Sequence, residues 1–208
     1  HLISVYSNEI SPLNNKLTTQ TEVLLASANK FSTETTEENL ELVQKDWKEF
    51  QNIWKQLELY DIGPIAGSFI SFEINRWPTD IGRIEDNIEG TENLTEEFIA
   101  SLGSSSKGIS AIEYLIFSPS GNTEILTQFT TDENATRRKE YLLALCENLQ
   151  SKSLTLKSLW ETNEESFINA VETGISGSQN QLVNAMVALI EETLKTKLGA
   201  PLGDKNGG

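Results

Sequence analysis

The sequence predicts an all-α protein, an up-and-down helical bundle with no significant β-sheet. Apolar residues recur at steps of three and four along most of the 208 residues, which is the spacing of one face of an α-helix. Capping residues and Gly or Pro breaks separate these stretches and leave short connections between long helices. No stretch alternates convincingly between polar and apolar residues, although the short segment EILTQFT, residues 124–130, is a candidate strand. Long amphipathic helices with short connections are typical of a helical bundle.

Two long helices are expected at the start of the chain. The first carries an apolar stripe from Ile3 to Phe31 that crosses Pro12, which either bends the helix or marks its true beginning. A capping box precedes the second helix, since Thr35 is followed three residues later by Glu38. The second stripe is rich in aromatic residues, which we interpret as core rather than as a cofactor platform. Its members are Leu40, Val43, Trp47, Phe50, Trp54 and Leu57.

The middle of the chain is more broken. A segment rich in Gly and Pro, residues 61–69, interrupts the helical pattern. Beyond it, Pro78 precedes Asp80, which is placed to cap a short helix. Another short helix is expected from Thr95 to Leu102. The apolar residues of the first short helix are Ile81, Ile84 and Ile88.

Helical patterns return in the last part of the chain. We expect a long helix within residues 132–161, a short helix within 163–174 and a further long helix over 178–199. The last of these stops at Gly199, a residue type that commonly ends helices. Its expected apolar face comprises Leu182, Ala185, Leu189, Leu194 and Leu198.

Composition excludes several classes of protein. The 31 acidic and 16 basic residues give a formal net charge of −15, and such an acidic surface repels the phosphates of nucleic acids. The sole histidine is His1, so catalytic triads with histidine and multi-histidine zinc sites are absent from this sequence. The sole cysteine, Cys146, excludes a disulfide framework, and we interpret it as a small buried hydrophobe. No apolar run reaches the roughly 20 residues that a membrane-spanning helix needs.

The stretch GISAIEYLIF, residues 108–117, sets a single acid among apolar neighbours. Ser110 and Glu113 are three residues apart, so one helical turn brings them to the same face. The pair is therefore either half of a polar site or the start of a helix with a partly buried glutamate.

Three segments, taken in order, resemble the imelysin-like family of bacterial envelope proteins. They are DWKEFQNIWKQLELYDIGP, NRWPTD and KGISAIEYLIF, which occupy residues 46–64, 75–80 and 107–117. In that family a Trp-rich helix with a glutamate is followed by a WP-x-D turn and then by a G-x-H-x-x-E helix with an apolar continuation. The tail LGAPLGDKNGG, residues 198–208, also resembles the family's connection into its second half.

The resemblance implies an all-helical fold of two related four-helix bundles, with residues 1–208 forming an imelysin-like domain in the N-terminal part of a longer protein. The family is named for a proposed metallopeptidase activity. It also includes a component of periplasmic ferrous-iron uptake and proteins linked to iron regulation. Members are typically periplasmic or surface lipoproteins, so we expect the bacterial periplasm or cell surface, a lipid anchor upstream of His1, and a C-terminal half that partners this one.

The sequence departs from the family pattern at Ser110, where the family has histidine. Imidazole is a good ligand for zinc or iron, whereas a serine hydroxyl is a poor one at neutral pH. Carried over residue by residue, the resemblance implies a metal site of Glu58, Asp80, Ser110 and Glu113, all of which supply oxygen. Oxygen ligands favour iron or calcium over zinc. The alternatives are a structural role for Glu113, a solvated Glu58 at a helix end, and a helix cap at Asp80.

We therefore expect a non-enzymatic envelope protein linked to the binding or uptake of metal, iron above all. One alternative is a metallopeptidase, which needs a metal-held water and a general base, and for which this chain lacks the usual imidazole ligands. The other is a helical interaction module in which the site has decayed. The expected partner is a metal ion or another envelope protein.

Overall fold

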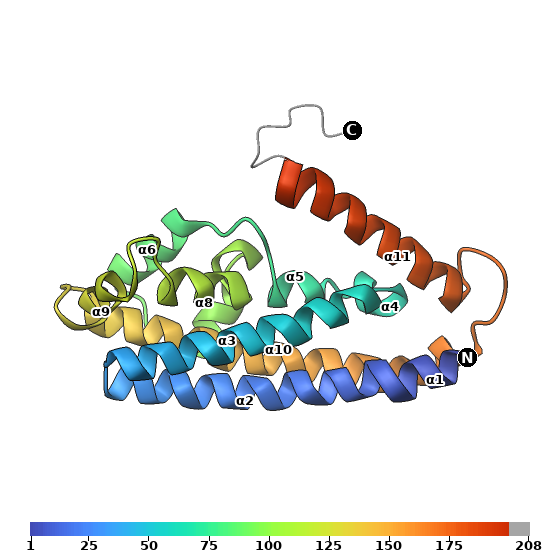
Figure 1. Cartoon of the computed structure of the whole chain (residues 1–208), viewed down its shortest axis with the longest axis horizontal. Helices are drawn as coiled ribbons and strands as arrows, with labels where there is room; N and C mark the ends of the chain where they lie inside the picture. Colours follow the sequence, from blue (N-terminus) through green and yellow to red (C-terminus); the bar gives the residue numbers. More distant parts are fainter. Residues whose placement is uncertain (200–208) are drawn as a thin grey trace.

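The computed structural model describes residues 1–199, which form helices joined by short connections (Figure 1). Three long helical segments make up the body, and a series of short helices covers one side of them. Within the described range no residue belongs to a strand. The prediction of an all-α bundle is confirmed.

The first long segment is continuous from Leu2 to Thr33. It comprises α1 (Leu2–Val5), a π-helical turn η1 (Tyr6–Ile10) and α2 (Ser11–Thr33). Pro12 lies directly after the wider π-helical turn, and the helix passes through it without interruption. Pro12 therefore does not mark the beginning of the helix.

The second long helix, α3 (Glu37–Leu57), begins one residue later than the predicted capping box implies. Thr36 is the N-cap, and its hydroxyl accepts a hydrogen bond from the backbone N–H of Asn39 at 3.3 Å. Thr35 instead donates its hydroxyl to the carbonyl oxygen of Phe31 in the preceding helix. The capping-box prediction is wrong because the end of α2 already engages the first threonine. The predicted aromatic stripe of α3 is buried, as expected.

The third long helix, α10 (Ala135–Asn169), unites two helices that the sequence had suggested were separate. The expected boundary between residues 132–161 and 163–174 does not exist. Trp160 and Phe167 are seven residues apart, so they share one helix face, and their rings meet edge to face with centroids 5.5 Å apart. Both are buried, and this packing favours an unbroken helix across the expected boundary.

Helix α2 lies between α3 and α10 and packs against both. Phe31 near the end of α2 contacts Phe129, which precedes α10, whereas Tyr6 at the other end contacts Trp160. These pairs show that α10 runs antiparallel to α2. Cys146 is buried within α10, as predicted, and burial raises the pKa of its thiol well above the usual range.

Short helices between α3 and α10 cover one side of the body (Figure 1). The candidate strand at residues 124–130 is helical, because Ile125 and Phe129 are one turn apart and both are buried on the same face. Asp80 caps a helix as predicted, since its Oδ1 accepts from the backbone N–H of Arg83 at 3.0 Å. The short elements are η2 (Glu58–Tyr60), α4 (Gly63–Gly67), α5 (Ile70–Ile74), α6 (Ile81–Glu89), α7 (Glu96–Ser101), η3 (Ser104–Ser106), α8 (Gly108–Ile116) and α9 (Asn122–Thr130).

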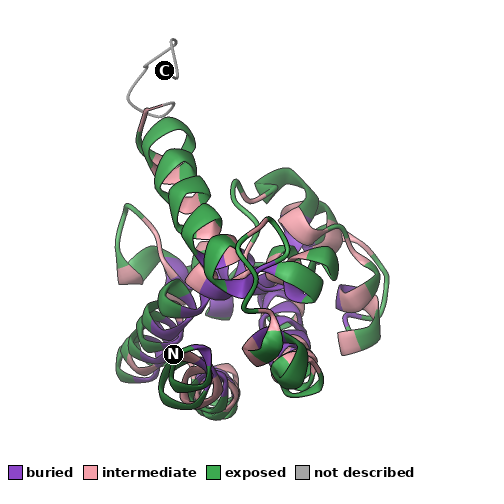
Figure 2. Ribbon diagram, turned by 90° about the vertical axis from the view of Figure 1, so that its right-hand side faces the viewer, coloured by how far each residue is buried: buried purple, intermediate pink, exposed green. Residues whose placement is uncertain are grey.

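The last helical segment leaves the body of the molecule. It consists of α11 (Ser178–Glu192) and a π-helical turn η4 (Thr193–Gly199), and Figure 2 shows it projecting with most of its surface exposed. Of its expected apolar face only Leu182 is buried, whereas Leu194 and Leu198 are exposed. That expectation is wrong for the outer half of the segment, which lies away from the bundle core. Of the tail that resembles the family's connection, residues 200–208 lie outside the described range.

The end of α5 and the start of α8 are held together by two neighbouring contacts. Gly108 has a positive φ of 73°, and a Cβ atom at this position would lie 2.4 Å from the carbonyl oxygen of Ile74. Beside it, Lys107 is only 2% exposed, and its Nζ lies 2.7 Å from a carboxylate oxygen of Glu73. Only glycine combines this backbone conformation with so close an approach.

We expect Gly108→Ala to lower the free energy of unfolding by about 2 kcal/mol or more, because both the clash and the positive φ oppose a side chain. Urea unfolding measures the loss. Gly103→Ala is the matched control, since nothing lies within 4 Å of its Cβ position and its φ is −61°. Equal stability of the two variants would contradict the role of this contact.

Candidate functional site

The four residues that the sequence predicts as metal ligands are divided among three places in the structure. Glu58 at the start of η2 and Ser110 in the first turn of α8 belong to one hydrogen-bond network, which Asn75 joins. Asp80 caps α6, and Glu113 lines a hollow beside α8 that Ser110 also lines. Hydrogen bonds therefore join Glu58 and Ser110 through Asn75, whereas Ser110 and Glu113 share the lining of one hollow.

The carboxylate of Glu58 accepts hydrogen bonds from three side chains. The indole Nε1 of Trp54 donates at 2.8 Å, and the ammonium of Lys55 donates to both carboxylate oxygens at 2.8 Å. The amide Nδ2 of Asn75 donates at 3.2 Å. The side chain of Glu58 is only 13% exposed, so these donors replace most of its hydration. The charge of Glu58 is therefore paired with Lys55, and its carboxylate oxygens accept hydrogen bonds from side chains rather than being fully solvated.

Asn75 connects Glu58 to Ser110, and the sequence analysis did not identify it. An ionised carboxylate only accepts hydrogen bonds, so the amide must present Nδ2 to Glu58. Its Oδ1 then faces Ser110, whose hydroxyl donates at 2.8 Å. Asn75 directly follows α5 and is the first residue of the matched segment NRWPTD, and this position was the signal in the sequence that could have identified it.

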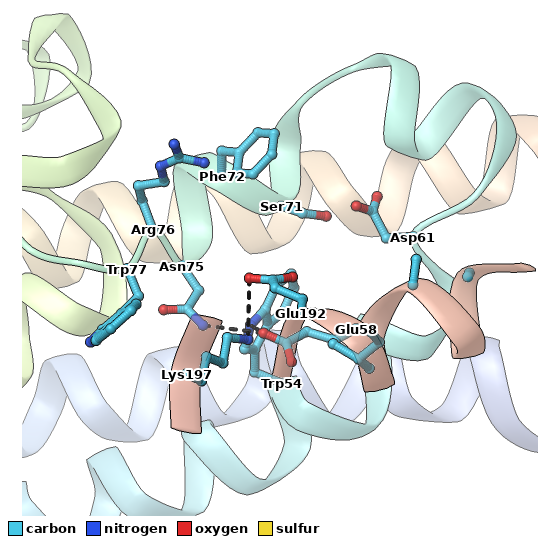
Figure 3. A pocket seen from close by; sticks show the side chains of 13 residues that line it. Trp54, Glu58, Asp61, Ser71, Phe72, Asn75, Arg76, Trp77, Glu192 and Lys197 are labelled. Atoms are coloured by element: carbon cyan, nitrogen blue, oxygen red, sulfur yellow. Dashed lines mark hydrogen bonds and ion pairs between the residues drawn. The ribbon is translucent and has the colours of Figure 1, made fainter. Parts of the chain in front are cut away.

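A cavity of about 210 Å³ opens beside this network (Figure 3). Asp61 lines it one helical turn after Glu58, and Figure 3 shows the side chains of Asp61 and Ser71 facing each other. On the side of α11 and η4, Glu192 and Lys197 form an ion pair at 3.7 Å. Besides these residues the cavity is lined by Trp54, Phe72, Asn75, Arg76, Trp77, Ala185, Ala188 and Leu189.

The surroundings of Asp61, one of the acids of this cavity, disfavour the ionised form of its carboxyl group. Burial raises the pKa of its carboxyl group, the negative charge of Glu58 adds to the increase, and the Ser71 hydroxyl opposes it in part. Its Oδ1 is buried and has no hydrogen-bond partner among the described residues. The sequence analysis missed Asp61 because the sequence does not reveal which acid of the segment becomes buried.

Glu113 lines a wider hollow of about 610 Å³ between α8 and the turn that contains Trp77. No hydrogen bond or ion pair to its carboxylate occurs within residues 1–199. Although Glu113 reaches solvent, its neighbours exclude enough water to raise the pKa of its carboxyl group. Glu113 thus lacks the hydrogen bond that a structural role would have given it.

The chemistry of the described residues does not fit a closed metal site. Within residues 1–199 no group of three or more His, Cys, Asp or Glu side chains is placed to hold one metal ion. Glu58 and Asp61 share a cavity, but the oxygens of Glu58 already accept from three donors, and Glu113 lines the other hollow. We derive no chemical step through a metal here. The assignment of Glu58, Asp80, Ser110 and Glu113 as metal ligands stays a prediction.

Comparison with known proteins places this fold. The model of the imelysin family matches residues 12–207. An imelysin-like protein from Psychrobacter arcticum 273-4 superimposes with a TM-score of 0.78 at 20% identity, covering 97% of this chain and 62% of that one. A candidate iron-regulated protein A precursor from Parabacteroides distasonis ATCC 8503 gives a TM-score of 0.75 at 18% identity, covering 100% of this chain. The chain spans 62% of the length of both, and a search of curated proteins gives no match. The resemblance carried by the three ordered segments is confirmed.

We expect Asp61→Asn to be more stable than the unaltered chain at pH 8. A folded-state pKa above the unfolded value means that ionised Asp61 weakens the fold, and this penalty is fully present above the raised pKa. The penalty disappears as the pH falls below the unfolded value near 3.8, so the difference between the two proteins closes toward pH 4. Urea unfolding at pH 8, 6 and 4 measures it.

Asp86→Asn is the control, because Asp86 is exposed on α6. A stability difference for Asp61→Asn that does not change with pH would show that burial of the charge is not the cause.

Proposed function

The chain belongs to the imelysin family, and we propose that it is a non-enzymatic protein of the bacterial cell envelope that serves iron acquisition as a binding component. The fold is that of its structural relatives, of which it spans 62%. The activity and partners of a longer protein, including the second half and a lipid anchor, belong to the same proposal. Within residues 1–199 no helix has both the length and the apolar character needed to cross a membrane.

The observation that carries a binding role rather than a catalytic one is the hydrogen-bond chain from Ser110 through Asn75 to Glu58. A metallopeptidase needs a metal-held water and a general base within reach of it. The carboxylate of Glu58 is held by Trp54, Lys55 and Asn75, so its oxygens already accept hydrogen bonds from three side chains. Ser110 stands at the position where the family pattern has a metal-binding imidazole, and its hydroxyl donates a hydrogen bond to Asn75.

The link to iron is supported by one of the structural relatives. The protein from Parabacteroides distasonis is described as a candidate precursor of an iron-regulated protein, which supports both the iron link and a place outside the cytoplasm. Iron held directly by this chain would depend on acids such as Glu113 and Asp61, which lack full hydrogen bonding. Since these acids line different hollows, we favour a role in which the chain binds a partner of the iron pathway.

Introducing a histidine at position 110 tests whether the serine there accounts for weak metal binding. We expect Ser110→His to gain zinc affinity by about tenfold or more over the unaltered chain, because it places a nitrogen ligand one turn from Glu113. Calorimetric titration with zinc, calcium and ferric citrate measures binding. Ser120→His, in an exposed turn, is the control for a histidine placed elsewhere.

Saturable binding of ferric iron or calcium to the unaltered chain, lost in Glu113→Ala, would be the opposite result. It would replace the partner-binding role by the oxygen-ligand metal site that the sequence predicts.

A separate assay tests the absence of catalysis. We expect labelled, unfolded casein to remain intact during incubation with the chain and zinc, since neither Glu58 nor Ser110 is free to activate a metal-bound water. Fluorescence release measures cleavage. Cleavage that a chelator stops and that Glu113→Ala abolishes would establish the metallopeptidase alternative.

A further inference from the structure

The hollow beside α8 has features that the proposed function does not use. We define the Trp77 hollow by its main lining residues, which are Trp77, Pro78, Ile81, Glu113, Tyr114 and Phe117. Its volume of about 610 Å³ falls within the range of about 300–1,000 Å³ that ligand pockets occupy. Aromatic and aliphatic groups form most of this lining, and Glu113 is its single acid.

Two large apolar side chains of this hollow are exposed. Trp77 is 46% exposed and Ile81 is 50% exposed. Pro78 adjoins Trp77 in the turn that leads to α6. Neighbouring exposed apolar side chains around a hollow are typical of a surface that binds a ligand or another protein.

Two cations near α8, Arg138 and Lys107, are engaged with acids other than Glu113. Arg138 makes a two-pronged pair with Glu85, at 3.0 and 2.7 Å, and Tyr114 donates its hydroxyl to the same carboxylate. Lys107 is buried against Glu73. Glu113 therefore presents a partly desolvated carboxylate that has no donor within the described part of the chain. A ligand that supplies charged N–H groups would compensate for its lost hydration.

The ring of Phe117 in this aromatic wall already contacts one cation of the chain itself. The ammonium of Lys48 lies over it, 5.4 Å from the ring centroid. A guanidinium group is planar, stacks on an indole or phenyl face, and pairs with a carboxylate through two parallel hydrogen bonds. The Trp77 hollow offers both kinds of contact, and the net charge of −15 attracts basic partners from a distance.

We propose that the Trp77 hollow binds an arginine side chain of a partner polypeptide, with the guanidinium against Glu113 and the aromatic wall and with flanking apolar residues on Trp77 and Ile81. This interaction goes beyond the proposed function, because it needs no metal and specifies what the binding component recognises.

The probe is the peptide acetyl-Gly-Leu-Arg-Leu-Gly-amide, titrated calorimetrically into the full 208-residue chain in the presence of a chelator. The same peptide with citrulline in place of arginine keeps the shape and removes the charge. We expect saturable binding of the arginine peptide. The citrulline peptide should bind with an affinity lower by about tenfold or more, since a charge-assisted hydrogen bond is lost.

Protein variants locate the site. Glu113→Gln preserves shape and should weaken the arginine peptide by about tenfold while leaving the citrulline peptide unchanged. Trp77→Ala should weaken both peptides, because it removes the stacking surface. Glu140→Gln, at an exposed acid of α10 outside the hollow, should change neither.

Equal affinity for the two peptides, full binding by Glu113→Gln, or no binding up to millimolar concentration would each overturn the proposal. Because the chelator is present throughout, these outcomes do not depend on whether the chain binds metal. Failure of this interaction is thereby separated from failure of the proposed link to iron.

Discussion

The contact between Gly108 and the carbonyl oxygen of Ile74 determines how the middle of the molecule is assembled. It brings two backbones closer than any side chain would allow, and the neighbouring Lys107 adds a buried ion pair with Glu73. A buried charge pair of this kind needs accurate geometry, since removing either partner would leave the other unpaired. The glycine provides that geometry by fixing the end of α5 against the start of α8.

The hydrogen-bond network of Ser110, Asn75 and Glu58 depends on the same contact between α5 and α8. Asn75 is the residue after α5 and Ser110 lies in the first turn of α8, so the close approach of the two helix ends brings their side chains within hydrogen-bond distance. Asn75 then reaches Glu58 beyond the end of α3. Three elements that are distant in the sequence are thus joined through one amide. The turn after Asn75 also carries Trp77 toward α8, where it forms one wall of the second hollow.

The sequence predicted what depends on local periodicity and missed what depends on tertiary contacts. Helical spacing identified the long helices, and the Asp80 cap was correct because capping is a local interaction. The choice between Thr35 and Thr36 as cap depended on the carbonyl groups at the end of α2. In the site, motif matching selected Glu58 and Ser110. Their link through Asn75 requires the packing of α5 on α8, which no local pattern encodes.

The residue at position 110 determines how the network beside α8 is hydrogen-bonded. A serine hydroxyl can donate one hydrogen bond, and here it donates to the Oδ1 of Asn75. The amide Nδ2 is thereby oriented toward Glu58, so the three side chains satisfy one another. The family pattern has an imidazole at this position, one helical turn from Glu113. Among residues 1–199 no cation pairs with Glu113, which lies beside the aromatic residues of the Trp77 hollow. With serine at position 110, the Trp77 hollow combines an acid with an aromatic wall, and the proposed binding of a basic side chain uses this combination.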